Sequence, residues 1–139
     1  MLGVDYGMRR VGLALSDPTG TLASPLTTLR RRRGKRPPVA AVAELARTHE
    51  AEGIVVGLPL TLRGEEDDWC GEVRRFGEAL AERTGLPVTW VDERFTSVQA
   101  ERAVRSAGLP RGEREDKARV DAGAAAVILQ TWLDGAPAR

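Results

Sequence analysis

Three short apolar segments open this chain with no helix between them, and this order restricts the folds that the chain can adopt. The segments at 1–6, 10–16 and 22–29 are separated only by Gly7-Met8-Arg9 and by a turn that contains Pro18-Thr19-Gly20. Short connections of this kind predict two successive hairpins. We therefore expect three antiparallel strands in a row.

The rest of the chain alternates between helical and strand patterns. Apolar residues at helical spacing predict helices at 39–46, 69–84, 100–107 and about 117–133, and short apolar runs predict buried strands at 54–58 and 87–91. The expected order is βββαβαβαα. This order predicts an α/β fold with a mixed sheet, antiparallel at first and then parallel, and with helices on both faces.

Composition excludes several classes of protein. A chain of 139 residues has room for one domain of ordinary size, and we treat 1–139 as a single domain. The formal net charge of +1 excludes attraction of the whole molecule to nucleic acid or membranes. One cysteine, Cys70, and one histidine, His49, exclude an intrachain disulfide and a Cys/His zinc site. The apolar runs are too short to cross a membrane, so we expect a cytoplasmic protein.

Acidic residues lie inside one predicted strand and directly after another. Asp5 lies inside the first strand, where alternation places it on one face with Gly3 and Gly7, which leave room for a ligand. The alternative is an Asp that only forms a turn. The run Asp92-Glu93-Arg94 follows the strand at 87–91, at the edge of a parallel sheet where ligands gather. Alternation does not decide which acid points inward, and Asp92 or Thr96-Ser97 could instead cap the next helix.

A third acid, Asp121, lies on the face of the last predicted helix that packs on the sheet. A carboxylate is costly there unless it has a partner, and Lys117, one turn earlier, is the nearest candidate. Neighbouring alanines allow this helix to approach the strand that holds Asp5. A cluster of ionised acids is stable only with cations between its members, and hard oxygen ligands select Mg²⁺ or Mn²⁺. Such an ion could activate water to hydrolyse a phosphodiester.

Basic residues gather in two segments. Six of the seven residues at 30–36 are Arg or Lys, and a second cluster comprises Arg111, Arg114, Lys117 and Arg119. Either segment could be a solvated loop or could bind phosphates in a salt-dependent manner. An aromatic content of 4% argues against base-stacking surfaces.

Four motifs resemble those of the YqgF (RuvX) family, named as pre-16S rRNA nucleases and related to Holliday junction resolvases of the ribonuclease H superfamily. In chain order they are Gly3-Val4-Asp5-Tyr6-Gly7 with Arg10-Val11-Gly12, Gly57-Leu58-Pro59 with Gly64, Asp92-Glu93-Arg94-Phe95-Thr96-Ser97, and Lys117 with Val120-Asp121-Ala122 and Ala125-Ala126. The resemblance covers nearly the whole chain. It implies a ribonuclease H-like fold with a five-stranded mixed sheet in the order 3-2-1-4-5.

The resemblance also implies a set of site residues. The catalytic and metal-binding acids are Asp5, Glu93 and Asp121, with Asp92 in reserve. Substrate-binding candidates are Arg94, Lys117, Arg10, Gly57, Arg31 and Arg33. Arg94 could instead pair with a neighbouring acid, and Gly57-Leu58-Pro59 could simply end a strand. Junction resolvases usually add a fourth acid one turn after the third, where this chain has Ala124 and Ala125.

The expected function is Mg²⁺- or Mn²⁺-dependent hydrolysis of nucleic acid, at the 5′ end of precursor 16S rRNA, by a monomer or weak homodimer that acts on ribosomal particles. One alternative is resolution of branched DNA, which needs two active sites. Another is a non-catalytic RNA-binding assembly factor. A sugar-kinase or actin-like ATPase also begins with an Asp-x-Gly strand, but it needs two lobes and this chain has room for one.

Overall fold

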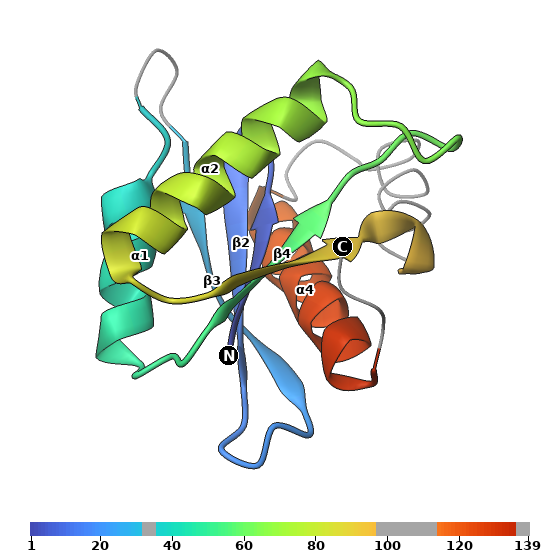
Figure 1. Ribbon diagram of the computed structural model, residues 1–139. Helices are drawn as coiled ribbons and strands as arrows, with labels where there is room; N and C mark the ends of the chain where they lie inside the picture. Colours follow the sequence, from blue (N-terminus) through green and yellow to red (C-terminus); the bar gives the residue numbers. More distant parts are fainter. Residues whose placement is uncertain (32–35, 97–113, 136–139) are drawn as a thin grey trace.

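The computed structural model describes residues 1–31, 36–96 and 114–135 (Figure 1). Its elements are β1 (Leu2–Tyr6), β2 (Arg10–Ser16), β3 (Ala23–Arg30), α1 (Val39–Thr48), β4 (Ile54–Leu58), α2 (Asp68–Thr84), β5 (Val88–Asp92), the 3-10 turn η1 (Glu93–Phe95) and α4 (Arg114–Leu133). The predicted order is confirmed over these residues, and β3 begins one residue later than expected. The helix expected at 100–107 and the possible cap Ser97 lie outside the described residues.

The five strands form one sheet in the order β3-β2-β1-β4-β5. The two hairpins are antiparallel, whereas β4 runs parallel to both β1 and β5. The predicted mixed sheet and its strand order are therefore confirmed. Because β1, β4 and β5 are parallel, their carboxyl ends meet at one edge of the sheet.

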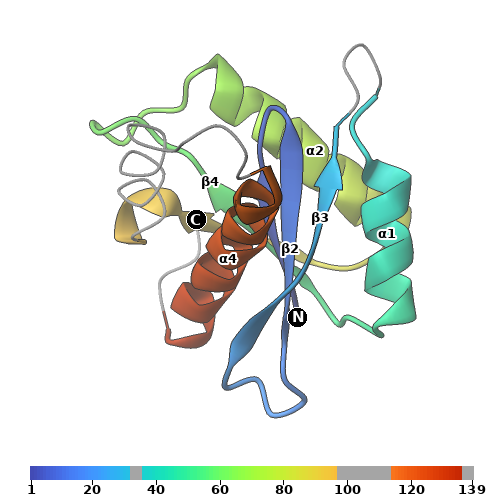
Figure 2. The same cartoon turned by 180° about the vertical axis from the view of Figure 1, so that it is seen from behind.

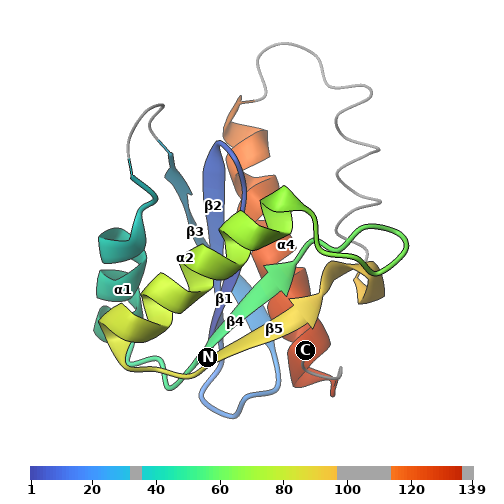
Figure 3. The same cartoon turned by 45° about the horizontal axis from the view of Figure 1, so that its top comes forward.

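Helices cover both faces of the sheet, as predicted. Figures 1 and 2 show α4 on one face and α1 and α2 on the other, and Figure 3 shows α2 crossing in front of the strands while α4 lies behind them. The central strands β1 and β4 are buried at all five positions because both of their faces are covered. No helix in the described part of the chain is long and apolar enough to span a membrane.

Each face of β1 contributes to a different hydrophobic core. Leu2, Val4 and Tyr6 pack with the side chains of α1 and α2. Gly3 faces α4, because a Cβ placed on it would lie 2.7 Å from Leu129 Cβ. The alternation predicted for β1 is thus confirmed, and Asp5 lies on the α4 face.

Candidate active site

Asp5 is buried in a cross-strand row of the sheet, here called the row of Asp5, in which its neighbours are Gly12 on β2 and Gly57 on β4. It is 3% exposed, and its partner on β2 is Gly12. On the other side, the register that pairs Val4 with Val56 brings the next residue of β4, Gly57, beside Asp5. The Asp5 carboxylate therefore has a glycine on each neighbouring strand, and on the α4 face the space above these two glycines is filled by α4 and Glu93.

The backbone of α4 lies directly on one of these glycines. A Cβ built at Gly12 would lie 2.0 Å from the carbonyl oxygen of Asp121. This contact brings Asp121 to the strand next to Asp5, in agreement with the close approach predicted for this helix. The Asp121 side chain is 23% exposed, and its Oδ2 lies 3.7 Å from Nη1 of Arg10. Asp121 thus has a cation beside it from β2, whereas the Lys117 side chain lies outside the described residues.

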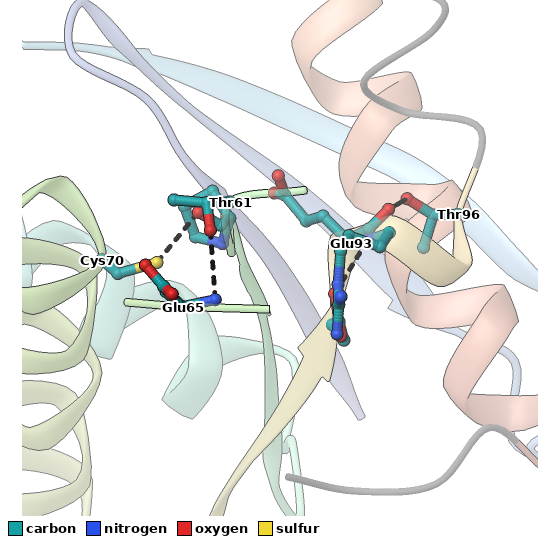
Figure 4. Close-up of polar contacts among 8 residues, drawn as sticks. Thr61, Glu65, Cys70, Glu93 and Thr96 are labelled. Atoms are coloured by element: carbon teal, nitrogen blue, oxygen red, sulfur yellow. Dashed lines mark hydrogen bonds and ion pairs between the residues drawn. The ribbon is translucent and has the colours of Figure 1, made fainter. Parts of the chain in front are cut away.

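Glu93 occupies the space above the other glycine. A Cβ built at Gly57 would lie 2.8 Å from Glu93 Oε1 and 2.6 Å from Ile128 Cδ1. Glu93 is 2% exposed and is the first residue of η1. Figure 4 shows this turn, in which the Thr96 hydroxyl donates to the Glu93 carbonyl oxygen at 2.7 Å. Of the two acids at the end of β5, Glu93 is therefore the one that reaches the row of Asp5.

Asp92 does not reach the row of Asp5 but binds Arg94 instead. It is fully buried and accepts hydrogen bonds from the Arg94 backbone N–H at 2.9 Å and from Arg94 Nη2 at 2.7 Å. It caps η1 and fixes the Arg94 guanidinium. The helix that the sequence alternative expected Asp92 to cap, at 100–107, lies outside the described residues. The Arg94 guanidinium also lies against Gly64, where a Cβ would be 3.0 Å from Nη1. Arg94 therefore joins η1 to the loop between β4 and α2.

The loop between β4 and α2 is itself fixed by hydrogen bonds (Figure 4). The Thr61 carbonyl oxygen accepts from Gly64 N–H at 2.8 Å, and the Thr61 hydroxyl accepts from Glu65 N–H at 3.1 Å. The Cys70 thiol donates to the Pro59 carbonyl oxygen at 2.9 Å. Burial raises the pKa of Cys70, so this thiol stays protonated and structural.

Arg31 lies on the opposite face from the three acids. Its guanidinium lies 4.6 Å from the Tyr6 ring centroid, and it donates to the Gly7 carbonyl oxygen at 3.0 Å. A third contact joins it to Glu72 on α2, at 3.4 Å. Arg31 is thus held by the fold, and Arg33 lies outside the described residues. Arg10 differs from both because it pairs with one of the three candidate acids, Asp121.

Comparison with known proteins places the chain in a family. A family model described as "RuvX: Holliday junction resolvase" matches residues 1–135. The chain belongs to the RuvX (YqgF) family. RuvX-type relatives named "Putative pre-16S rRNA nuclease" include one from Anaeromyxobacter sp. (strain Fw109-5), 45% identical over 96% of both chains. Another, from Chloroflexus aurantiacus, is 42% identical over 96% of this chain and 86% of its own.

Solved structures support the same fold. Thermus thermophilus RuvC in complex with a Holliday junction substrate superposes with a TM-score of 0.60 at 18% identity, covering 100% of this chain and 99% of RuvC. A second Thermus thermophilus RuvC structure gives a TM-score of 0.57 at 17% identity. The predicted ribonuclease H-like fold of this RuvX member is confirmed, and RuvX is a nuclease family.

The acids of this RuvX chain suit a hard divalent cation. Nucleases of this fold generally use divalent metals. All three side chains offer carboxylate oxygens, which favour Mg²⁺ or Mn²⁺ over zinc. The absence of a Cβ at Gly12 and Gly57 lets α4 and Glu93 lie directly against the two strands beside Asp5. Among the described residues, no three or more Asp, Glu, His or Cys side chains are already arranged as a metal site. One turn after Asp121, Ala124 and Ala125 are buried in the core against the sheet.

Proposed function

We propose that this chain is a divalent-metal-dependent endonuclease that processes the 5′ end of precursor 16S rRNA. The observation that carries this proposal is the packing around Asp5, where Glu93 Oε1 lies above Gly57 and the backbone carbonyl of Asp121 lies above Gly12. Relatives named as nucleases of precursor 16S rRNA support the choice of substrate. We infer that the protein acts in the cytoplasm on ribosomal particles, as a monomer or weak homodimer.

The proposed mechanism assigns a role to each side chain. Asp5, Glu93 and Asp121 would hold Mg²⁺ or Mn²⁺. When bound, the ion supplies an activated water and stabilises charge on the leaving oxygen. Arg10 orients the Asp121 carboxylate through their ion pair. Gly12 and Gly57 allow α4 and Glu93 to lie against the strands on either side of Asp5. Arg10 and Lys117 would contact phosphates, and Arg94 would hold the neighbouring loop in place.

Replacement of Asp121 tests this function directly. The Asp121→Asn variant keeps the size of a partly exposed side chain but loses the charge that would bind the cation. We expect cleavage of a precursor 16S 5′ fragment to fall by more than about 100-fold, beyond the loss typical of changes around metal ligands. The melting temperature should stay near wild type. The control is Asp134→Asn, an exposed acid just after α4, which should cleave normally.

Two competing functions are separated in the same assay. Each protein is incubated with the RNA fragment and with a four-way DNA junction, in Mg²⁺, in Mn²⁺ and in EDTA. Faster cutting of the junction would replace RNA processing by junction resolution, which the likeness to the RuvC fold favours. Tight RNA binding that ignores EDTA, with no cutting of either substrate, would indicate a non-catalytic assembly factor. Loss of folding in Asp121→Asn would make that residue structural.

A further inference from the structure

Two arginines face each other at one end of the sheet. The pairing of β2 with β3 sets Arg10 directly opposite Arg30, followed by Gly12 opposite Thr28. Side chains in such a pair have Cβ atoms about 4.5 to 5.5 Å apart, and like charges directly opposite are destabilising. The fold therefore starts two cationic side chains from directly opposite positions, an arrangement that a bound anion would stabilise.

The pair lies on the face of the candidate active site. Val11 and Leu29, the next residues along the two strands, pack on the α1 and α2 side of the sheet. Alternation then turns Arg10 and Arg30 to the α4 face. The ion pair of Arg10 with Asp121 agrees with this orientation. Arg10 and Arg30 thus share a face with all three acids.

The two guanidinium groups are only partly neutralised. Asp121 Oδ2 lies 3.7 Å from Arg10 Nη1, whereas Arg30 is exposed and forms no ion pair within the described residues. Among the side chains that the structure describes, a single carboxylate lies beside these two arginines. A phosphate group has several anionic oxygens and accepts hydrogen bonds from two guanidinium groups, so it matches this pair.

Arg31, the next residue after Arg30, differs from it because its guanidinium already has several partners. Its guanidinium is occupied by the Tyr6 ring, the Gly7 carbonyl oxygen and Glu72, on the other face of the sheet. Its backbone N–H also donates to the Arg9 carbonyl oxygen at 2.8 Å, which closes this end of the hairpin. Arg31, directly after β3, is therefore held by the fold, whereas Arg30 at the end of β3 is exposed.

We propose that Arg10 and Arg30 form a cross-strand binding site for a backbone phosphate of the nucleic-acid substrate. This inference rests on the proposed function and adds the direction of the bound strand. Because β3 is two strands from β1, about 10 Å away, the bound phosphate is a neighbour of the scissile one. The substrate strand then runs from Asp5 across β2 toward the β3 edge, on the α4 face.

The salt dependence of RNA binding tests the pair. Binding of a fluorescent precursor 16S 5′ fragment is measured in EDTA, so that no cutting occurs, over a range of salt concentrations. We expect Arg30→Gln to weaken binding by about threefold to tenfold and to lower the slope of log Kd against log salt by about 0.7 to 0.9. The control is Arg83→Gln, an exposed arginine in the last turn of α2, which should match wild type. A wild-type slope for Arg30→Gln would overturn the proposal.

A second measurement uses the protein without nucleic acid. Inorganic phosphate should raise the melting temperature of wild type more than that of Arg30→Gln. In phosphate-free, low-salt buffer the variant should be at least as stable as wild type, because a like-charge contact has been removed. A clear loss of stability there would show a structural role for Arg30 instead. Wild-type protein that binds this RNA but never cuts it would contradict the proposed nuclease function. The salt dependence of binding would still test the arginine pair, because that measurement needs no cutting.

Discussion

Tyr6 offers a precise test at the scale of a single residue, because it is the one tyrosine of the chain. It is 4% exposed, stacks on Phe76 with ring centroids 4.2 Å apart, and donates to Glu72. Burial raises its pKa to about 12. The fold therefore favours the neutral phenol, and this stabilisation is complete below about pH 10 and is lost as the pH rises from 10 to 12.

Ultraviolet absorbance of tyrosinate measures this effect. We expect the folded protein to ionise Tyr6 only near pH 12 and the urea-unfolded chain to do so near pH 10. Stability against urea should decline between these two values. Ionisation near pH 10 in the folded state would contradict the burial of Tyr6 between the sheet and α2.

Gly57 gives a second prediction at this scale. A methyl group at this position would meet Glu93 Oε1 and Ile128 Cδ1, so Gly57→Ala should displace the carboxylate from the row of Asp5. We expect cleavage to fall at least about tenfold and the free energy of unfolding to fall by about 1 to 3 kcal/mol. The control is Gly71→Ala on α2, where the nearest atom would be the flexible Arg75 guanidinium at 3.5 Å. Equal cleavage by both variants would show that Glu93 has no part in the chemistry.

Single residues also show how far sequence reasoning reaches. The face of Asp5 was predictable, because a strand alternates with a fixed period of two. Alternation could not choose between Asp92 and Glu93, because the chain leaves the strand at this point for a 3-10 turn. Only the family resemblance indicated Glu93. The position of the Arg31 side chain was not predictable from sequence, because it packs on the ring of Tyr6, which is distant in the chain.

At the scale of elements, the packing of α4 on β2 depends on Gly12. A Cβ there would meet the carbonyl oxygen and carbon of Asp121 at 2.0 and 2.4 Å, and backbone atoms cannot move aside as a flexible side chain can. We expect Gly12→Ala to cost about 3 kcal/mol or more, or to prevent α4 from docking. Chemical denaturation measures the loss, and circular dichroism reports whether the helix remains.

Gly123 on α4 is the matched control. A Cβ at this position has nothing within 4 Å, so Gly123→Ala should stabilise the protein by about 0.5 to 1 kcal/mol through helix propensity alone. Similar stabilities for the two variants would contradict the close contact between α4 and β2.

The presence of the strands and helices was predictable from local sequence patterns, whereas the close packing of α4 on the sheet was not. Hairpin turns and helical spacing indicated the strands and the helices. Alanines in α4 indicated a helix that could approach the sheet, but the sheet contributes equally through Gly3 and Gly12. That contribution depends on the register between strands, which a sequence pattern does not contain.

At the scale of the whole molecule, a cation bound by the three acids should raise the stability of the folded protein. Repulsion among carboxylates destabilises the folded state, and a cation that binds only this state stabilises it. At ten times its Kd, Mn²⁺ or Mg²⁺ should add about 1.4 kcal/mol, a rise of a few degrees in Tm. The rise should vanish in Asp5→Asn and persist in Asp134→Asn. An equal rise in Asp5→Asn would place the ion elsewhere on the molecule.

The candidate site draws its acids from opposite ends of the chain, with Asp5 on the first strand and Asp121 on the last helix. Contacts between distant parts of a chain are the slowest to form during folding. On the proposed assignment of these acids, the site is complete only when folding is complete. A copy still being synthesised, or one that has lost α4 to a protease, would lack one of the proposed ligands and would leave nucleic acid uncut.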